Sequence, residues 1–145
     1  MSIARLSSYY AVSPQIRPED MSGIAASGFR AIVNNRPDAE APDQPGSVEL
    51  EAEAKRLGMG YAYIPVVPGQ LNEAPARSLG QFLGGVDGPV LGFCRTGTRS
   101  AGLWALAQAS HGNVVEIMEA AARAGYDLSS LRTQLDGAAA GRDDA

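Results

Sequence analysis

The single cysteine of this chain, Cys94, lies in a run of residues that could hold an anion, Cys-Arg-Thr-Gly-Thr-Arg-Ser. Cysteine acts as a nucleophile in its thiolate form, which nearby positive charge and hydrogen-bond donors favour. The two arginines offer charge and a bidentate fork, and three hydroxyls and the N–H groups of a tight loop offer donors. We therefore predict Cys94 and Arg99 as catalytic residues, and Arg95, Thr96, Gly97, Thr98 and Ser100 as an anion-binding loop.

The elements on either side of this run decide where it lies in the fold. Residues 90–93 predict an apolar strand, and residues 100–109 predict a helix with an apolar stripe. Further strands are expected at 9–12, 29–33 and 61–67, and further helices at 18–26, 48–57, 72–83 and 114–124. The alternation predicts an α/β fold of three layers, in which helices flank a mostly parallel sheet of about four strands. Ligands in such folds bind at the carboxyl ends of strands, where Cys94 lies.

The length of 145 residues suits one compact domain. We predict a single catalytic domain over residues 1–134. Residues 135–145 end in small and polar residues, and we expect a flexible C-terminal tail there.

Composition excludes several function classes. The net charge is −4, whereas a nucleic-acid-binding protein normally carries a basic patch. No apolar stretch has the length of a membrane span, and the N-terminus has no signal-peptide core. From the charge and the lack of an apolar stretch we expect neither nucleic-acid nor membrane partners. One cysteine cannot form an internal disulfide, so we expect a cytoplasmic protein. Neither metal-ligand spacing nor a nucleotide-binding glycine motif occurs, and we expect no metal and no cofactor.

The pattern Cys-x-x-Gly-x-Arg-Ser resembles the active-site loop of rhodanese-type sulfurtransferases and a shortened tyrosine phosphatase loop. The wider chain resembles the DUF442 family, the beta-lactamase-hydrolase-like, phosphatase-like or sulfur transferase domains that are related to dual-specificity tyrosine phosphatases. The matching segments are residues 34–40, 44–45, 63–66, 89–91 and 94–104, with a weaker match at 124–128. The resemblance implies a tyrosine-phosphatase-like fold, a cysteine nucleophile, and a possible partner in a metallo-β-lactamase-like persulfide dioxygenase.

Two departures from the phosphatase pattern bear on the reaction. Four residues separate Cys94 from Arg99, whereas the phosphatase loop has five, and the resemblance implies that the shorter loop suits sulfane sulfur. Phosphatases of this type also carry an aspartate after the strand that corresponds to residues 61–67, and residues 66–72 contain no acid. General acid catalysis contributes about 10²–10⁴-fold, so its absence disfavours phosphate ester cleavage.

A second polar loop follows the strand at 29–33 and reaches the same edge of a parallel sheet. Within it, Arg36 and Asp38 are candidates for the rim of the site, together with Glu40. Arg36 could attract an anionic substrate. Alternatively, the loop is a solvated surface segment held by its own ion pairs.

Three functions remain open from the sequence. The first is a sulfurtransferase, in which a Cys94 persulfide carries sulfur from a small anionic sulfur donor to an acceptor. The second is a phosphatase that hydrolyses a phosphoester through a cysteinyl-phosphate held by Arg99. The third is a non-catalytic module that binds a persulfide or another anion for a partner protein.

Overall fold

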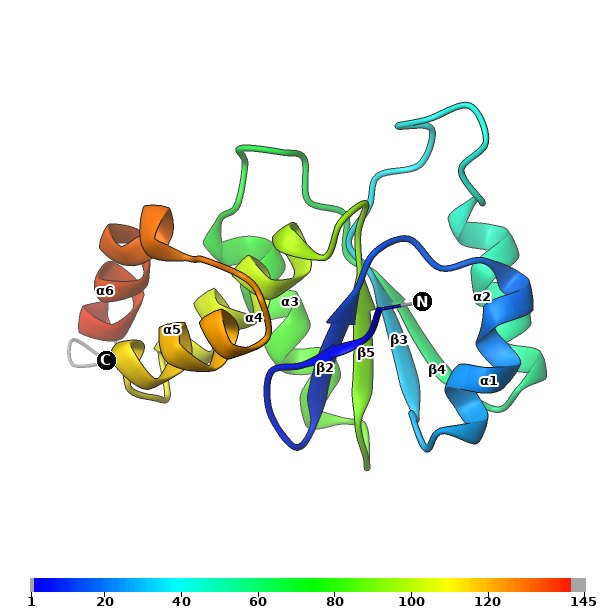
Figure 1. Ribbon diagram of the computed structural model, residues 1–145, viewed down its shortest axis with the longest axis horizontal. Coiled ribbons are helices and arrows are strands. Elements are labelled where there is room, and N and C mark those ends of the chain that lie inside the picture. The colour runs from blue at the N-terminus through cyan, green and yellow to red at the C-terminus, as the bar shows by residue number, and fades with distance from the viewer. Residues whose placement is uncertain (1, 142–145) are drawn as a thin grey trace.

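A computed structural model describes residues 2–141 of the chain. Figure 1 shows a central sheet with helices on both sides. The strands are β1 (Ala4–Arg5), β2 (Tyr10–Ser13), β3 (Ala31–Asn34), β4 (Gly60–Tyr63) and β5 (Val90–Phe93). The α-helices are α1 (Met21–Ala26), α2 (Ser47–Arg56), α3 (Glu73–Gly84), α4 (Thr98–Ala109), α5 (Val114–Arg123) and α6 (Arg132–Gly141), with short 3-10 helices at η1 (Pro18–Asp20) and η2 (Ser129–Leu131).

The sheet has the strand order β1-β2-β5-β3-β4. The pairs β2–β5, β5–β3 and β3–β4 are parallel, and only β1 runs antiparallel to its neighbour. The carboxyl ends of β2, β5 and β3 therefore meet at one edge, and the register pairs Phe93 with both Ser13 and Asn34. Residues that follow these strands are brought together there.

Alternation along the strands divides the core into two parts. Ala11, Ile32 and Leu91 face α1 and α2 and belong to one apolar cluster. Val12 and Val33 lie on the opposite face, in a cluster with α4. This two-residue period is what a strand requires when both of its faces are covered.

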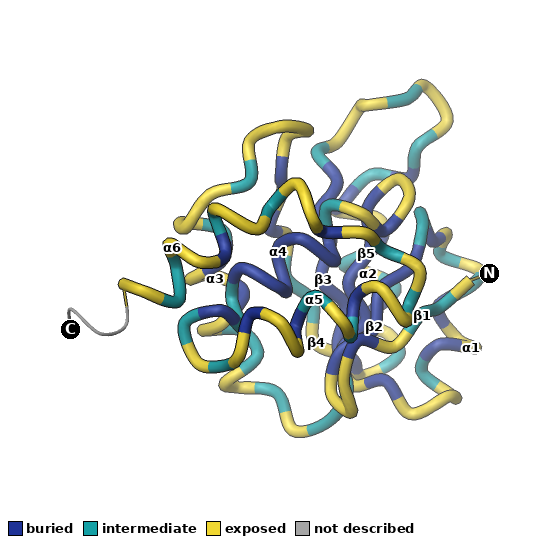
Figure 2. Tube along the Cα trace, turned by 60° about the vertical axis from the view of Figure 1, so that its left-hand side comes forward, coloured by how far each residue is buried: buried dark blue, intermediate teal, exposed yellow. Residues whose placement is uncertain are grey.

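Helix α4 is the most buried helix of the second layer (Figure 2). It contacts α3, α5, α6 and the sheet, which surround it and leave it little solvent-facing surface. Gly102 allows the close approach, because a Cβ there would lie 3.1 Å from Leu131 and 3.3 Å from Leu71. The burial fixes the N-terminal end of α4, which follows the Cys94 loop.

The α/β fold of three layers is confirmed, but two expectations differ from the structure. The sheet has five strands because β1, only two residues long, adds an edge that has no periodic sequence signal. The flexible tail expected from residue 135 is wrong for residues 135–141, which form most of α6, with Leu135 fully buried. Residues 142–145 of the expected tail lie outside the described residues. Within residues 2–141, no helix has the length and apolar character needed to cross a membrane.

Candidate active site

Cys94 follows β5 directly, at the sheet edge where three parallel strands end. Its side chain lies in the interior, with a relative exposure of 1% for the residue. The backbone N–H of Asn35 donates to the carbonyl of Phe93 at 2.9 Å, which joins the segment after β3 to the end of β5. The predicted position of the nucleophile is therefore set by strand pairing.

The loop from Cys94 to Arg99 turns at Gly97. Gly97 has a φ of 94°, in the left-handed region that favours glycine, and is the N-cap of α4. Its N–H donates to the Cys94 Sγ at 3.1 Å. The sulfur thus receives a backbone hydrogen bond next to a helix N-terminus, whose partial positive charge stabilises anions.

The hydroxyl side chains of the loop have different roles. Thr96 and Thr98 are exposed, and their hydroxyl oxygens lie 3.1 Å apart. Ser100 is buried and donates to Asn35 Oδ1 at 2.8 Å. Asn35 in turn donates to the Ile64 carbonyl at 2.8 Å. Ser100 therefore fixes α4 to the neighbouring loop and does not point its donor at the sulfur.

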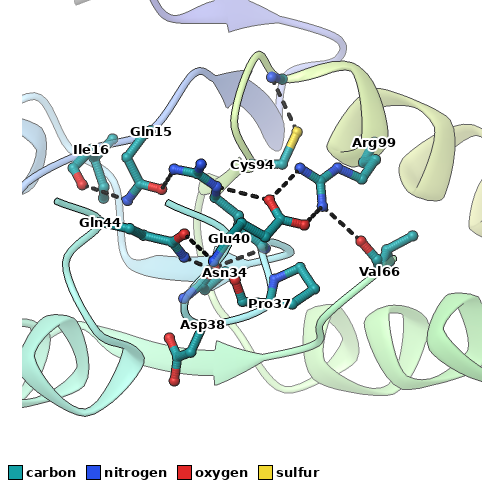
Figure 3. A network of polar contacts seen from close by, with 12 residues as sticks. Gln15, Ile16, Asn34, Pro37, Asp38, Glu40, Gln44, Val66, Cys94 and Arg99 are labelled. Atoms are coloured by element: carbon teal, nitrogen blue, oxygen red, sulfur yellow. Dashed lines mark hydrogen bonds and ion pairs between the residues drawn. The ribbon is translucent and has the colours of Figure 1, made fainter. Parts of the chain in front are cut away.

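Arg99 is held by a carboxylate from the loop after β3 (Figure 3). Arg99 Nη1 and Nη2 donate to the two carboxylate oxygens of Glu40 at 2.8 and 2.9 Å. Arg99 Nη1 also donates to the Val66 carbonyl at 2.8 Å. Arg36 Nε donates to the same carboxylate at 2.9 Å and Arg36 Nη1 to Gln15 Oε1 at 3.0 Å. We call the group Arg36, Glu40 and Arg99 the arginine–glutamate clamp.

Glu40 and Val66 use only part of the Arg99 guanidinium. A guanidinium has five N–H donors in a fixed plane. Nη1 uses both of its protons on Glu40 and Val66, and Nη2 uses one on Glu40. The Nε–H and one Nη2–H are not used on Glu40 or Val66, and a hydrogen bond to the Cys94 side chain contributes to the raised pKa of Arg99. This pair forms a side-on fork next to the sulfur, with the shape that matches two oxygens of a phosphoryl, sulfonyl or carboxylate group.

The charges of the clamp stabilise one another. Hydrogen bonds from Arg99 and Arg36 lower the pKa of Glu40, so this carboxyl is ionised at neutral pH. The hydrogen bond to Glu40 raises the pKa of Arg99, and the negative charge of a Cys94 thiolate adds to that increase. Arg99 is therefore a permanent cation close to the sulfur, and Glu40 is poorly suited to donate a proton.

The other two charged candidates do not converge on Cys94. Arg95 has an exposed side chain, and only its carbonyl contacts the neighbouring segment, accepting from Gln15 N at 3.3 Å. Asp38 points away from Cys94 (Figure 3) and accepts from the Ser47 N–H at 2.9 Å, at the start of α2. Of the two predicted rim residues, Arg36 joins the site and Asp38 supports the loop behind it.

Two tyrosines that had no assigned role from the sequence lie beside the loop. The Tyr126 hydroxyl donates to the Thr96 carbonyl at 3.3 Å and lies against Gly97, where a Cβ would approach it to 2.2 Å. The Tyr10 hydroxyl is buried beside Gly92 and has no hydrogen-bond partner among the described residues. Burial and the charge of a Cys94 thiolate raise the pKa of Tyr10, which stays neutral. Gly92 and Gly97 can be identified in the sequence, but nothing in the sequence shows which side chain packs beside each of them.

A sequence family matches most of this chain and includes the site. Residues 3–111 match the family described as beta-lactamase hydrolase-like protein, phosphatase-like domain. The chain belongs to this family. The DUF442-type resemblance is thereby confirmed. A beta-lactamase hydrolase-like protein of Xylella fastidiosa is 34% identical over 137 residues, which are 93% of this chain and 32% of that protein. The chain thus spans about a third of the length of the curated relatives it matches.

One solved structure supports the same family assignment, and a more distant one shares the fold. A candidate phosphatase from Neisseria meningitidis Z2491 is 34% identical, with a TM-score of 0.83 over 95% of this chain and 99% of that chain. PTPMT1 in complex with PI(5)P is 15% identical, with a TM-score of 0.73 over 99% and 98% of the two chains. The tyrosine-phosphatase-like fold is confirmed. These relatives favour the phosphatase alternative over the sulfurtransferase that the loop length put first.

Proposed function

We propose that this phosphatase-like domain hydrolyses phosphate monoesters through a cysteinyl-phosphate on Cys94. The observation that carries the proposal is the side-on fork of Arg99, which Glu40 and Val66 leave unused, next to the Cys94 sulfur. The Gly97 N–H donates to the same sulfur at 3.1 Å. Such a cradle binds a tetrahedral dianion and stabilises the charge that builds up on its oxygens during transfer.

In the proposed first step, Cys94 Sγ attacks phosphorus and the bond to the ester oxygen breaks. The Arg99 fork and the Gly97 N–H hold the phosphoryl oxygens. In the second step water attacks phosphorus, the S–P bond breaks, and phosphate leaves with the thiolate restored.

Relatives support this chemistry by similarity. The family is phosphatase-like, and the Neisseria meningitidis structure is that of a candidate phosphatase. PTPMT1 was solved with a phosphoinositide, a phosphate ester, although at 15% identity it supports only the fold. The matched relatives are about three times as long as this chain, and their full activity and partners are not carried over.

Sulfur transfer is the second candidate, and one observation favours it. Four residues lie between Cys94 and Arg99, which gives a tighter cradle than the phosphatase loop. A sulfane sulfur is smaller than a phosphoryl group, and its transfer between thiols needs no proton on a leaving oxygen. The same thiolate and fork would hold a thiosulfate-type donor, and a persulfide dioxygenase-like protein would be a fitting partner.

One experiment separates the candidates. Hydrolysis of para-nitrophenyl phosphate and formation of thiocyanate from thiosulfate and cyanide are measured side by side for the wild type and Cys94→Ser. We expect ester hydrolysis that is lost in Cys94→Ser, with thiocyanate at background. Cys94-dependent thiocyanate without ester hydrolysis would establish the sulfurtransferase instead. Anion binding without turnover of either substrate would indicate a binding module.

A further inference from the structure

Phosphate ester cleavage needs a proton for the leaving oxygen, and the usual source is absent from this chain. Residues 66–72, which follow β4, contain no acid. Glu40 is bound by two arginines that lower its pKa. Asp38 is turned toward the start of α2. A proton donor must therefore come from another segment, and this inference rests on the phosphatase function proposed above.

A groove of about 220 Å³ opens beside Arg99. Its lining includes Thr98 and Arg99 at the start of α4, and four apolar side chains from the segments after β4 and before α6, which are Val67, Leu71, Leu128 and Leu131. Cavities of about 150 Å³ with apolar walls hold a benzene ring, so this groove has room for one aryl or short alkyl group. Arg99 belongs to both the clamp and the groove lining, so an organic group on a phosphoryl bound at Arg99 has this groove within reach.

Asp127 is the one carboxylate among the described residues that line this groove. Its neighbours hold it near the Cys94 loop. Tyr126 donates its hydroxyl to Thr96 and its N–H contacts the Ala121 carbonyl at 2.8 Å, while Leu128 is buried in the core. Asp127 thus lies between two anchored residues, on a segment tied to the nucleophile loop.

To donate a proton, Asp127 must be protonated when the ester is bound. In the free protein, the Ser129 N–H and hydroxyl lower the pKa of this exposed carboxyl. A phosphate dianion held by Arg99 would face the same groove, and repulsion between the two negative charges would raise the pKa of Asp127.

We propose that this groove receives the leaving group of an aryl or alkyl phosphate and that Asp127 protonates its oxygen. As Cys94 Sγ bonds to phosphorus, the electron pair of the breaking P–O bond passes to the ester oxygen, which takes the proton of the Asp127 carboxyl. The alcohol leaves. The Asp127 carboxylate then accepts a proton from the water that attacks phosphorus, and the electron pair of the breaking S–P bond returns to the sulfur.

The leaving group provides the test. Wild type, Asp127→Asn and Asp127→Glu are compared on phenyl phosphate, whose leaving phenol is a poor one, and on 2,4-dinitrophenyl phosphate, whose phenolate leaves without a proton. Asp87→Asn is the matched control, because Asp87 is exposed in the turn before β5, at the far end of the strand from Cys94. Thermal unfolding checks that each variant is folded.

We expect Asp127→Asn to lose about 10²-fold or more in kcat/KM on phenyl phosphate and little in kcat/KM on the dinitrophenyl ester, because kcat/KM reports the steps up to release of the alcohol and not the hydrolysis of the cysteinyl-phosphate that both esters share. Asp127→Glu should recover part of the loss, and Asp87→Asn should match the wild type. Equal effects on both esters, or none, would overturn the role of Asp127 while Cys94-dependent hydrolysis still stood. Absence of Cys94-dependent hydrolysis of either ester would refute the phosphatase function itself, and this inference with it.

Discussion

Replacement of Glu40 by glutamine tests whether the clamp positions Arg99. The carboxylate accepts three N–H groups, two from Arg99 and one from Arg36, at 2.8–2.9 Å. A glutamine offers one carbonyl oxygen, and its amide N–H₂ cannot face a guanidinium. Relative exposure of the Arg99 and Glu40 side chains is only 15% and 21%, so water replaces the lost contacts poorly.

The size of the effect follows from the bonds removed. Hydrogen bonds to charged groups contribute about 1.5–3 kcal/mol each. If Glu40→Gln removes the equivalent of one such bond from the oriented fork, kcat/KM falls roughly 10- to 150-fold, at about 1.4 kcal/mol per decade. The inhibition constant of inorganic phosphate should rise with it, because the fork binds the same oxygens.

Glu51→Gln is the matched control. Glu51 forms an exposed ion pair with Lys55 on α2, with a distance of 3.7 Å, and its loss should leave both constants unchanged. Equal kcat/KM for Glu40→Gln, Glu51→Gln and the wild type would show that Arg99 is oriented without Glu40, and the reasoning would be refuted.

The same variant has a pH signature in stability. The arginines hold the pKa of Glu40 below its ordinary value of 4.5, so its stabilising contribution is full above that pH and disappears as pH falls through the lowered pKa. The difference in unfolding free energy between the wild type and Glu40→Gln should therefore shrink on acidification from neutral pH. A difference that grows toward low pH would contradict the assignment.

Three further substitutions test the packing around the site. Leu135→Ala should cost about 2–5 kcal/mol in urea unfolding, because Leu135 is fully buried; a change near zero would mean that α6 does not stabilise the domain. Ser100→Ala leaves Asn35 Oδ1 without its 2.8 Å donor and should cost about 1–3 kcal/mol, and an unchanged melting temperature would argue against this bond. Gly97→Ala brings a Cβ to 2.2 Å from the Tyr126 hydroxyl and should reduce kcat. Adding Tyr126→Phe should restore part of the lost kcat. If kcat does not recover, the loss comes from the strained backbone at position 97 and not from the contact with Tyr126.

Strand patterns and glycine punctuation carried the prediction of the fold. β5 occupies residues 90–93 as predicted, because a short apolar run before a glycine-containing loop has few alternatives. Helix α6 was missed because Leu135 is an isolated leucine in a stretch rich in alanine and glycine. Its burial comes from the packing of α6 against α4 and α5, the two α-helices that precede it. Local patterns cannot show such a contact.

Some residues of the candidate site could be predicted from the sequence, and others could not. Cys94 and Arg99 could be assigned from their spacing alone, because one turn of loop before a helix places both at one helix end. The directions of the side chains in the loop after β3 could not be predicted from the sequence. Ala39 has a φ of 65°, and this left-handed turn separates Asp38, which faces α2, from Glu40, which faces Arg99. A left-handed alanine has no sequence signal, so the sequence placed Asp38 and Glu40 at the rim together and could not separate their directions.

The shortened Cys94 loop does not by itself decide between sulfur and phosphate. Arg99 is the second residue of α4 and is held by Glu40 and Val66 from two other loops, so its position depends on more than the number of residues after Cys94. Both reactions need an oriented fork for an anion, and both should weaken in Glu40→Gln. Only ester cleavage needs a proton on a leaving oxygen, so only that reaction should depend on Asp127. Activity that is sensitive at Glu40 and at Asp127 identifies phosphoryl transfer, and activity that is sensitive at Glu40 alone identifies sulfur transfer in the same cradle.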